Sequence, residues 1–131
     1  MAALSDAAEV LLLNYLMTAT SVTRPTAWYV ALYTGAPSDA GGGTEVSGGS
    51  YARKAVTWAT ATGAGGTTSN SNAPTWTASG GAFGTVTHIG IHSASSGSGN
   101  LLWHGAMTAS KVVNDGDTLE FAVGNIDLTI A

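Results

Sequence analysis

Three histidines lie close together in the chain and are the first candidates for chemistry. His88, His92 and His104 fall on two predicted strands that a polar turn connects. If that turn centres near Ser96, His88 faces His104 across the two strands, as a pair of metal ligands would. The chain has no cysteine, and no nearby carboxylate completes a tetrahedral site. Packing or interface roles are therefore favoured for these histidines, which can still titrate near pH 6 and affect assembly.

Acidic residues form a second candidate group at Asp115, Asp117 and Glu120. Three carboxylates so close together are a possible calcium site, because calcium takes oxygen ligands. The spacing is not that of an EF-hand loop, however, and the run Asn-Asp-Gly-Asp is explained by the chemistry of a tight turn. We therefore predict no metal site and no cofactor in either group, and we expect chelators to leave the fold unchanged.

Catalytic motifs are missing from the sequence. It contains no G-x-S-x-G, no H-E-x-x-H, no phosphate-binding glycine loop that opens a helix and no cysteine nucleophile. A fold can bring together two distant carboxylates for glycoside hydrolysis, but the chain has only eight acidic residues, mostly in predicted turns. We predict no catalytic residues and a protein that is not an enzyme.

A glycine-rich stretch at residues 41–56 holds Glu45 and Arg53, two of the few charges in the chain. Glycine loses more backbone entropy than any other residue, so this loop costs stability unless something holds it. Arg53 is expected on the same strand face as Tyr51. We predict that Glu45 and Arg53 pair, within a subunit or across a subunit boundary, and so hold the loop. The alternative is that both are independent solvated charges.

Length and composition restrict the classes of function. A chain of 131 residues forms one domain, 1–131, whose core needs no metal or disulfide. Four basic residues and a net charge of −4 do not suit nucleic-acid binding. No apolar run approaches the roughly 18 to 20 residues that span a bilayer, and a signal peptide is not expected. We therefore expect neither nucleic acid nor a membrane as a partner.

The low charge content indicates self-association. Only 9% of the residues are charged, whereas a soluble domain has about 25%. An apolar-leaning surface of this kind is expected to be covered by other subunits, in a trimer or, as the second choice, a dimer.

One helix is predicted, from about residue 6 to residue 18. Asp6, with Glu9 three residues later, resembles a capping box before an apolar run. A helix of this length is marginal alone, so it is expected to dock on the sheet or on a neighbouring subunit. The candidate subunit-docking residues are Val10, Leu13 and Met17.

The remainder, about residues 26–131, alternates apolar and polar residues in short runs. The predicted strands are 26–34, 51–59, 74–78, 84–92, 100–109, 111–113, 118–123 and a last strand with Ile126, Leu128 and Ile130, with loops at 35–50 and 60–73. In the strand 118–123, Leu119, Phe121 and Val123 are expected to point inward. Frequent turn signals without intervening helices indicate an antiparallel β-sandwich, jelly-roll-like or immunoglobulin-like.

Three blocks of the sequence, residues 29–56, 84–113 and 116–130, resemble a known family. Within them, the runs TEVSGGSYAR, GTVTHIGI and GNLLWHGA are specific in combination. They are similar to small virion proteins of tailed bacteriophages that are often labelled phage tail fibre protein. The resemblance implies a non-enzymatic structural component of the virion, in many copies beside other virion proteins, in the tail or tail-fibre region or at the particle surface.

Two alternatives to the tail-fibre role remain. One is a capsid decoration (cement) protein that stabilises the head. The other is a host carbohydrate-binding module, in which aromatic rings stack on sugars. Most of the chain's tryptophans lie in predicted strands with apolar neighbours, where core packing is favoured. Trp76 lies in a polar region and is the candidate exposed aromatic.

Overall fold

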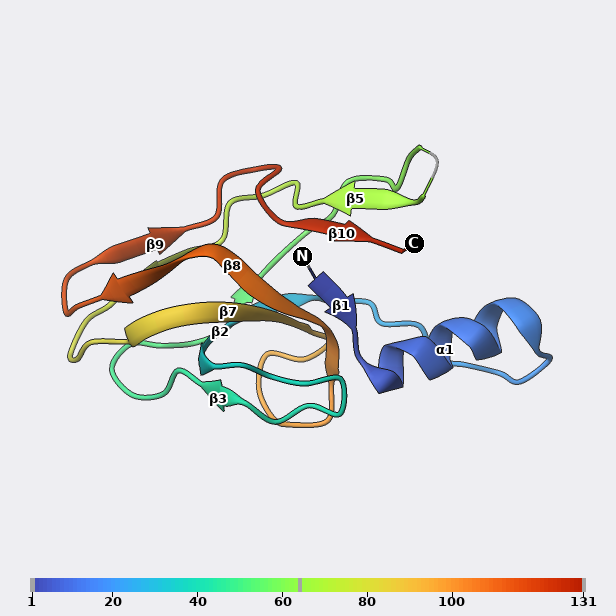
Figure 1. Cartoon of the computed structure of the whole chain (residues 1–131), viewed down its shortest axis with the longest axis horizontal. Coiled ribbons are helices and arrows are strands. Elements are labelled where there is room, and N and C mark those ends of the chain that lie inside the picture. The colour runs from blue at the N-terminus through green and yellow to red at the C-terminus, as the bar shows by residue number, and fades with distance from the viewer. Residues whose placement is uncertain (1, 64, 131) are drawn as a thin grey trace.

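The computed structural model describes residues 2–63 and 65–130, and it is mainly β with antiparallel sheets and one N-terminal helix. This fold class is the predicted one. Figure 1 shows the largest sheet at the centre, short strands above it and the helix projecting to one side.

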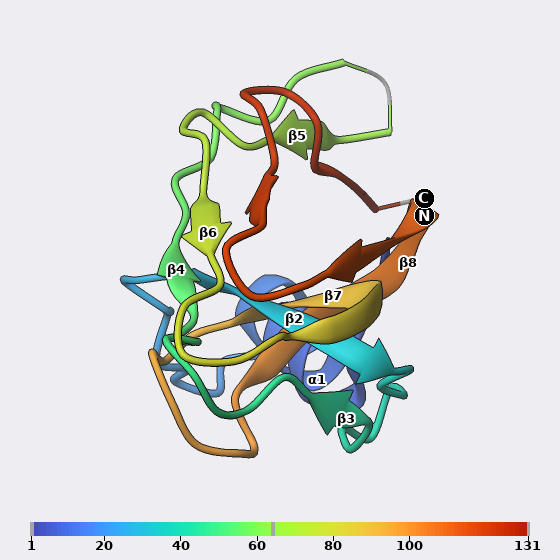
Figure 2. The same cartoon turned by 90° about the vertical axis from the view of Figure 1, so that its left-hand side faces the viewer.

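The central sheet has six strands, in the order β1–β8–β7–β2–β3, with β4 also pairing with β2. Their bounds are β1 Ala2–Leu4, β2 Tyr29–Gly35, β3 Thr44–Glu45, β4 Lys54–Ala55, β7 Gly84–His92 and β8 Leu101–Val113. Two smaller ribbons form the opposite layer of a sandwich-like arrangement (Figure 2). They pair β5 Thr67–Ser69 with β10 Asp127–Thr129, and β6 Thr75–Thr77 with β9 Thr118–Glu120.

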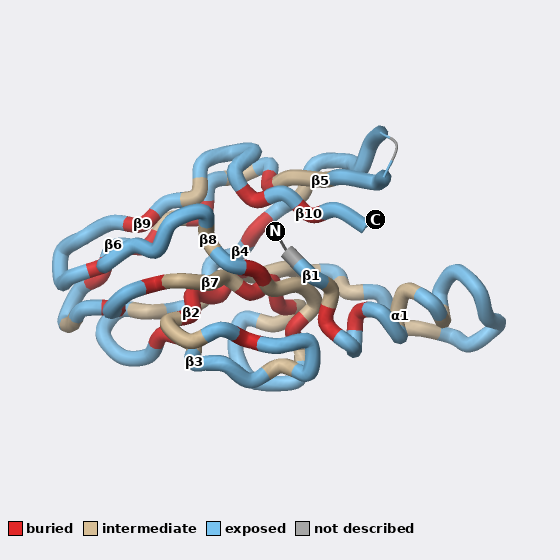
Figure 3. The backbone as a smooth tube through the Cα atoms, in the orientation of Figure 1, coloured by how far each residue is buried: buried red, intermediate tan, exposed pale blue. Residues whose placement is uncertain are grey.

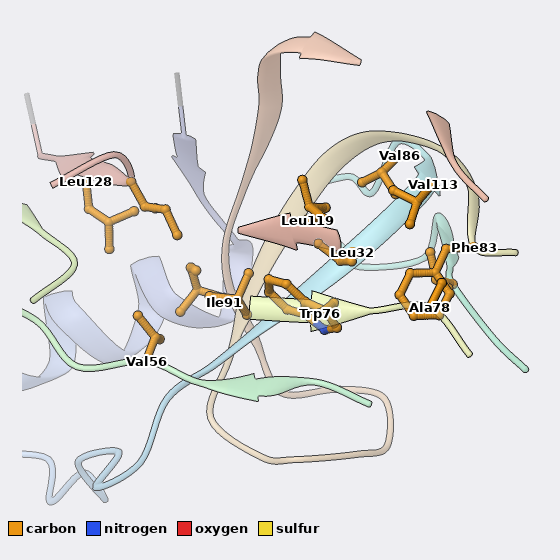
Figure 4. Close-up of a cluster of buried hydrophobic side chains, with 13 residues drawn as sticks. Leu32, Val56, Trp76, Ala78, Phe83, Val86, Ile91, Val113, Leu119 and Leu128 are labelled. Atoms are coloured by element: carbon orange, nitrogen blue, oxygen red, sulfur yellow. The ribbon is translucent and has the colours of Figure 1, made fainter. Parts of the chain in front are cut away.

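The core lies between the central sheet and the ribbons, and Figure 3 shows buried residues on strands of both layers. Its buried members are Val30, Leu32, Val46, Val56, Trp76, Ala78, Phe83, Val86, Ile91, Val113, Leu119, Ile126 and Leu128. These side chains come from both layers, so the core joins the sheet to the ribbons (Figure 4).

Trp76 lies inside this core, and the prediction of an exposed aromatic at this position is wrong. The residue is 1% exposed, and its indole N–H donates to the carbonyl oxygen of Ala52 at 2.8 Å. The ring of Phe121 packs against it edge to face. Its neighbours Thr75 and Thr77 make the segment look polar, but successive side chains of a strand point to opposite faces. Trp76 therefore points inward.

The helix α1, Asp6–Met17, forms where the sequence predicts it, but Ser5 rather than Asp6 is its N-cap. The Ser5 Oγ accepts a hydrogen bond from the backbone N–H of Ala8 and donates one to the carbonyl oxygen of Leu101. The first turn is thus attached to the start of β8. Within α1, only Ala8 is buried.

Several predicted strands and loops differ from the observed elements. In the predicted strand 51–59, only β4 pairs with β2, and Trp58 adds an isolated bridge to Asn70. The predicted loops 35–50 and 60–73 contain β3 and β5. Strands of two or three residues are too short to show an alternating pattern, which explains why the sequence does not reveal them.

The C-terminal strands are also shorter than predicted, whereas β8 is longer. β8 runs continuously from Leu101 to Val113. Leu119 and Phe121 are buried and half-buried, but Val123 is exposed and does not point inward. It lies beyond the end of β9, in a turn before β10, where the alternation of a strand no longer applies.

Candidate functional site

Glu45 and Arg53 form a bidentate ion pair within one subunit. The Arg53 Nε donates to the Glu45 Oε1 at 2.8 Å, and Nη2 donates to Oε2 at 2.8 Å. The Arg53 side chain is 5% exposed and that of Glu45 is 27% exposed. Two parallel hydrogen bonds between charged groups are among the strongest polar contacts in proteins. The predicted contact is therefore present, and its role in holding the loop stays a proposal.

The remaining donors of Arg53 reach the loop between β7 and β8, residues 93–100. Nη1 donates to the carbonyl oxygen of Ala94 at 3.0 Å and to the Oδ1 of Asn100 at 3.1 Å. Nη2 donates to the carbonyl oxygen of Gly97 at 2.8 Å. All five guanidinium N–H groups thus have acceptors. One side chain connects the glycine-rich loop to the β7–β8 loop.

Tyr51 connects the same carboxylate to the central sheet. Its hydroxyl donates to the Glu45 Oε1 at 2.8 Å and accepts from the backbone N–H of Leu32 at 3.0 Å. Burial raises the pKa of Tyr51, so its hydroxyl keeps its proton and remains a donor. Burial alone would raise the pKa of Glu45, but hydrogen bonds from Arg53 and Tyr51 outweigh it and lower that pKa overall. Glu45 is therefore ionised at neutral pH.

His92, the last residue of β7, continues this set of hydrogen bonds from Asn100 to Tyr33 on β2. Its Nδ1 lies 2.6 Å from the Oδ1 of Asn100, and its Nε2 lies 2.9 Å from the hydroxyl of Tyr33. Because the Asn100 Oδ1 already accepts from Arg53, it acts as the acceptor for Nδ1–H, and Nε2 accepts the Tyr33 proton. Burial lowers the pKa of His92, and the Arg53 charge adds to the effect. The imidazole is thus held neutral.

We call Glu45, Tyr51, Arg53, His92 and Asn100 the arginine network. Its donors and acceptors are directed at one another and at backbone carbonyls, so its geometry supports a structural task. The sequence predicts the Glu45–Arg53 pair from charge and spacing. His92 and Asn100 could not be assigned to it, because only the tertiary fold brings residues 93–100 to Arg53.

The prediction that His88 faces His104 across the two strands is wrong, because the observed pairing is shifted by two residues. The strand register places His88 opposite Ala106 and His104 opposite Gly90. Irregularities in the β7–β8 ladder shift the register from that of a simple hairpin. The Nε2 of His104 instead lies 2.7 Å from the Asp39 Oδ1. In residues 2–63 and 65–130, no group of three potential metal ligands is found.

The three acidic side chains near the C-terminus have separate partners. Asp117 accepts from the backbone N–H of Asn114 at 2.9 Å, which closes its own turn. Asp115 accepts from the N–H of Gly81, and Glu120 accepts from the hydroxyl of Thr75. The Asp117 contact is the turn chemistry that the sequence indicates, whereas the Asp115 and Glu120 contacts reach other segments.

The helix is the most exposed apolar element. Val10 and Leu13 are each 60% exposed and Met17 is 76% exposed, and Tyr15 and Leu16 are exposed as well. None of the helices in the described part of the chain has the length and apolarity needed to cross a membrane. That these residues dock on another subunit stays a prediction.

Three tryptophans gather at a cavity that the sequence does not reveal. Trp28, Trp58 and Trp103 line a volume of about 260 Å³, together with aliphatic side chains that include Ile91 and Leu128. We call this the tryptophan cavity. The three indoles come from segments far apart in the chain and meet only in the folded structure.

Taken together, the fold and these features define a small antiparallel β domain with two loops joined by the arginine network and with an outward apolar helix. Over residues 3–129 the chain matches the family model described as Podophage GP4 fiber I protein gp80. The match covers nearly the whole chain, so the protein belongs to this family of podophage fibre proteins. This confirms the resemblance to phage tail fibre proteins. No curated protein matches the chain.

Proposed function

We propose that the protein is a non-enzymatic structural component of a bacteriophage virion, present in many copies in the tail-fibre region. The observation that carries this proposal is the match to a podophage fibre protein over residues 3–129. A match of this extent includes the helix, the central sheet and both ribbons, so the whole domain supports a fibre role.

The arginine network suits such a role. A fibre component presents fixed surfaces to its neighbours, and glycine-rich loops alone do not supply them. In this protein, Arg53 joins two loops to each other, and Tyr51 joins them to β2. Through these contacts, the loops would present one fixed shape to a neighbour.

The experiment is immunogold electron microscopy of intact particles with an antibody raised against the folded domain. We expect gold at the tail fibres of each particle, and none with pre-immune serum. Gold over the head would contradict the tail-fibre role and favour the capsid decoration alternative. If intact particles carry no gold but denatured particles react with the antibody on a blot, the chain is present and its position is determined by placing the domain in an electron-microscopy map of the virion. Absence of the chain from purified particles would overturn the proposal.

A further inference from the structure

The tryptophan cavity, with Trp28, Trp58 and Trp103 in its lining, is a hollow of about 260 Å³. Each of these three residues is half-buried and packs against the buried core. Ile91 of β7 and Leu128 of β10, two core residues drawn in Figure 4, also line the cavity. Because both layers of the domain hold the lining in place, a ligand would find the cavity already shaped.

Three of the four indole N–H groups have no hydrogen-bond acceptor within residues 2–63 and 65–130. Only Trp76 donates its indole proton, to the carbonyl oxygen of Ala52. In the same part of the chain, no buried side-chain polar atom lacks a partner. The N–H groups of Trp28, Trp58 and Trp103 are therefore reached by solvent. An occupant that displaces this water must supply acceptor atoms, because a buried donor without an acceptor is costly.

Charge restricts the occupant further. Of the described residues that line the cavity, none has a charged side chain. A charged ligand would lose its hydration there without gaining a counter-ion. A quaternary ammonium ion is attracted to aromatic rings, but it offers no acceptor to an indole N–H. An aliphatic side chain of another protein offers none either. The occupant that fits is therefore uncharged, with acceptor oxygens and an apolar face.

A sugar ring has these properties. Its C–H groups form an apolar face that stacks on indole rings, and its oxygens accept hydrogen bonds from indole N–H groups. Thr68, also in the lining, donates its hydroxyl proton to the carbonyl oxygen of Ala59, which leaves its own oxygen free to accept from a ligand hydroxyl. Pockets for drug-sized ligands have about 300 to 1,000 Å³. A volume of about 260 Å³ therefore suits a single ring.

We propose that the tryptophan cavity binds one uncharged pyranose ring, as a free sugar or as one unit of a glycan. Indole rings stack on the C–H face of the sugar, and N–H groups of Trp28, Trp58 and Trp103 donate to its oxygens. This inference goes beyond the proposed structural role and does not depend on where in the virion the chain lies.

The test is nuclear magnetic resonance of the isotope-labelled chain, in which each of the four indole N–H groups gives one signal. The probes are the methyl glycosides of glucose, galactose, mannose, rhamnose and N-acetylglucosamine. At least one of them should shift the signals of Trp28, Trp58 or Trp103 to saturation in the millimolar range. The Trp76 signal is the internal control and should stay in place, because its N–H is bonded inside the core. No saturable shift with any of these glycosides would overturn the inference.

Variants test which groups hold the sugar. Trp28→Phe, Trp58→Phe and Trp103→Phe each remove one N–H, keep an aromatic ring and assign one signal. At least one of them should bind the glycoside roughly two- to tenfold more weakly, and wild-type affinity in all three would overturn the inference. Ala61→Phe, at an exposed position of the lining, should block the cavity and abolish the shifts. Ala40→Phe, at an exposed alanine outside the lining, is the matched control and should bind like the wild type.

Further probes separate the possible ligands. The disaccharide that ends in the bound sugar identifies the source: equal affinity indicates a unit of a glycan, and binding of the single ring alone indicates a free sugar. Saturable shifts with tetramethylammonium chloride, and none with the neutral glycosides, would show a cation site and overturn the inference. Its failure would leave the proposed function standing, because that rests on the family match and is tested by labelling of the virion.

Discussion

The arginine network and the helix α1 differ in how their side chains are satisfied. Around Arg53, each guanidinium N–H has an acceptor in the same copy. Along α1, the large apolar residues Val10, Leu13 and Met17 remain exposed. The hydrogen bonds of the arginine network are satisfied within a single copy, whereas α1 leaves apolar side chains exposed.

This difference shows how a chain with few charges can use them. Two of its four basic and eight acidic residues, Arg53 and Glu45, form an ion pair beside loops that glycine makes costly to order. The apolar residues of α1 add little to the core of their own copy, since only Ala8 is buried. The polar contacts of the arginine network lie within one copy, and we propose that the exposed apolar residues of α1 join copies.

Removing Arg53 should give the largest loss of stability. Arg53→Met removes the two guanidinium hydrogen bonds to Glu45, which keeps the Tyr51 hydroxyl as a donor, and it removes the donors to the carbonyl oxygens of Ala94 and Gly97. Breaking a buried ion pair costs about 3 to 5 kcal/mol, and the lower end is expected because Glu45 is 27% exposed. Urea unfolding measures the change. Lys54→Met, one residue along at an exposed position, is the control and should change stability by less than about 0.5 kcal/mol.

A double-mutant cycle with Glu45→Gln and Arg53→Met sharpens this result. Because the two side chains share two hydrogen bonds, we expect a coupling free energy of about 1 to 3 kcal/mol. If the two single changes simply add, the pair does not hold the loop. The loop would then be ordered by its other contacts.

Acid should destabilise the network in two steps. Burial lowers the pKa of His92 in the folded state, so the unfolded chain takes up a proton first as the pH falls below about 6.5. Stability therefore decreases from about pH 6.5 down to the folded pKa. Arg53, Glu45 and Tyr33 are the ionisable groups that face this histidine. Thermal melting against pH should show the slope, and His92→Gln should flatten it.

The second step belongs to Glu45. Its pKa is lowered in the folded state, so its contribution is complete above about pH 4.5 and is lost as the pH falls through the folded pKa. Melting curves of Glu45→Gln should lack this step while retaining the step near pH 6. A wild-type melting temperature that is constant from pH 7 to pH 5 would contradict the His92 assignment, and one that does not fall as the pH is lowered below about 4.5 would contradict the Glu45 assignment.

The smallest effect is expected at the exposed contact between Asp39 and His104. Asp39 is exposed, and exposed ion pairs contribute at most about 1 kcal/mol. Asp39→Asn should therefore lower the free energy of unfolding by less than about 1 kcal/mol, measured by urea unfolding. A loss as large as that of Arg53→Met would mean that this contact, too, is structural.

Sequence patterns predict the long elements and miss the short ones for a physical reason. The predictions of the helix and of β7 are confirmed, because each element has enough residues to show the spacing of apolar residues typical of its type. β3, β4 and β5 have two or three residues each, and they exist because β2 and β10 supply their hydrogen-bond partners. Trp76 is misjudged because its polar neighbours hide the inward position.

The candidate sites show the same limit. The Glu45–Arg53 contact is predictable because the two residues are close in sequence and opposite in charge. His92 and Asn100 join Arg53 through the register of β7 and β8, which no local pattern reports. The tryptophan cavity likewise assembles from distant segments.

The most direct test is amide hydrogen exchange of the wild-type chain at low and high protein concentration. We predict that amides of α1 from Val10 to Met17 exchange rapidly when dilute and become protected as concentration rises. Amides in residues 44–53 and 93–100, which surround Arg53, should exchange at the same rate throughout. Helix protection that does not depend on concentration, or loop protection that does, would contradict the division between contacts within a copy and contacts between copies.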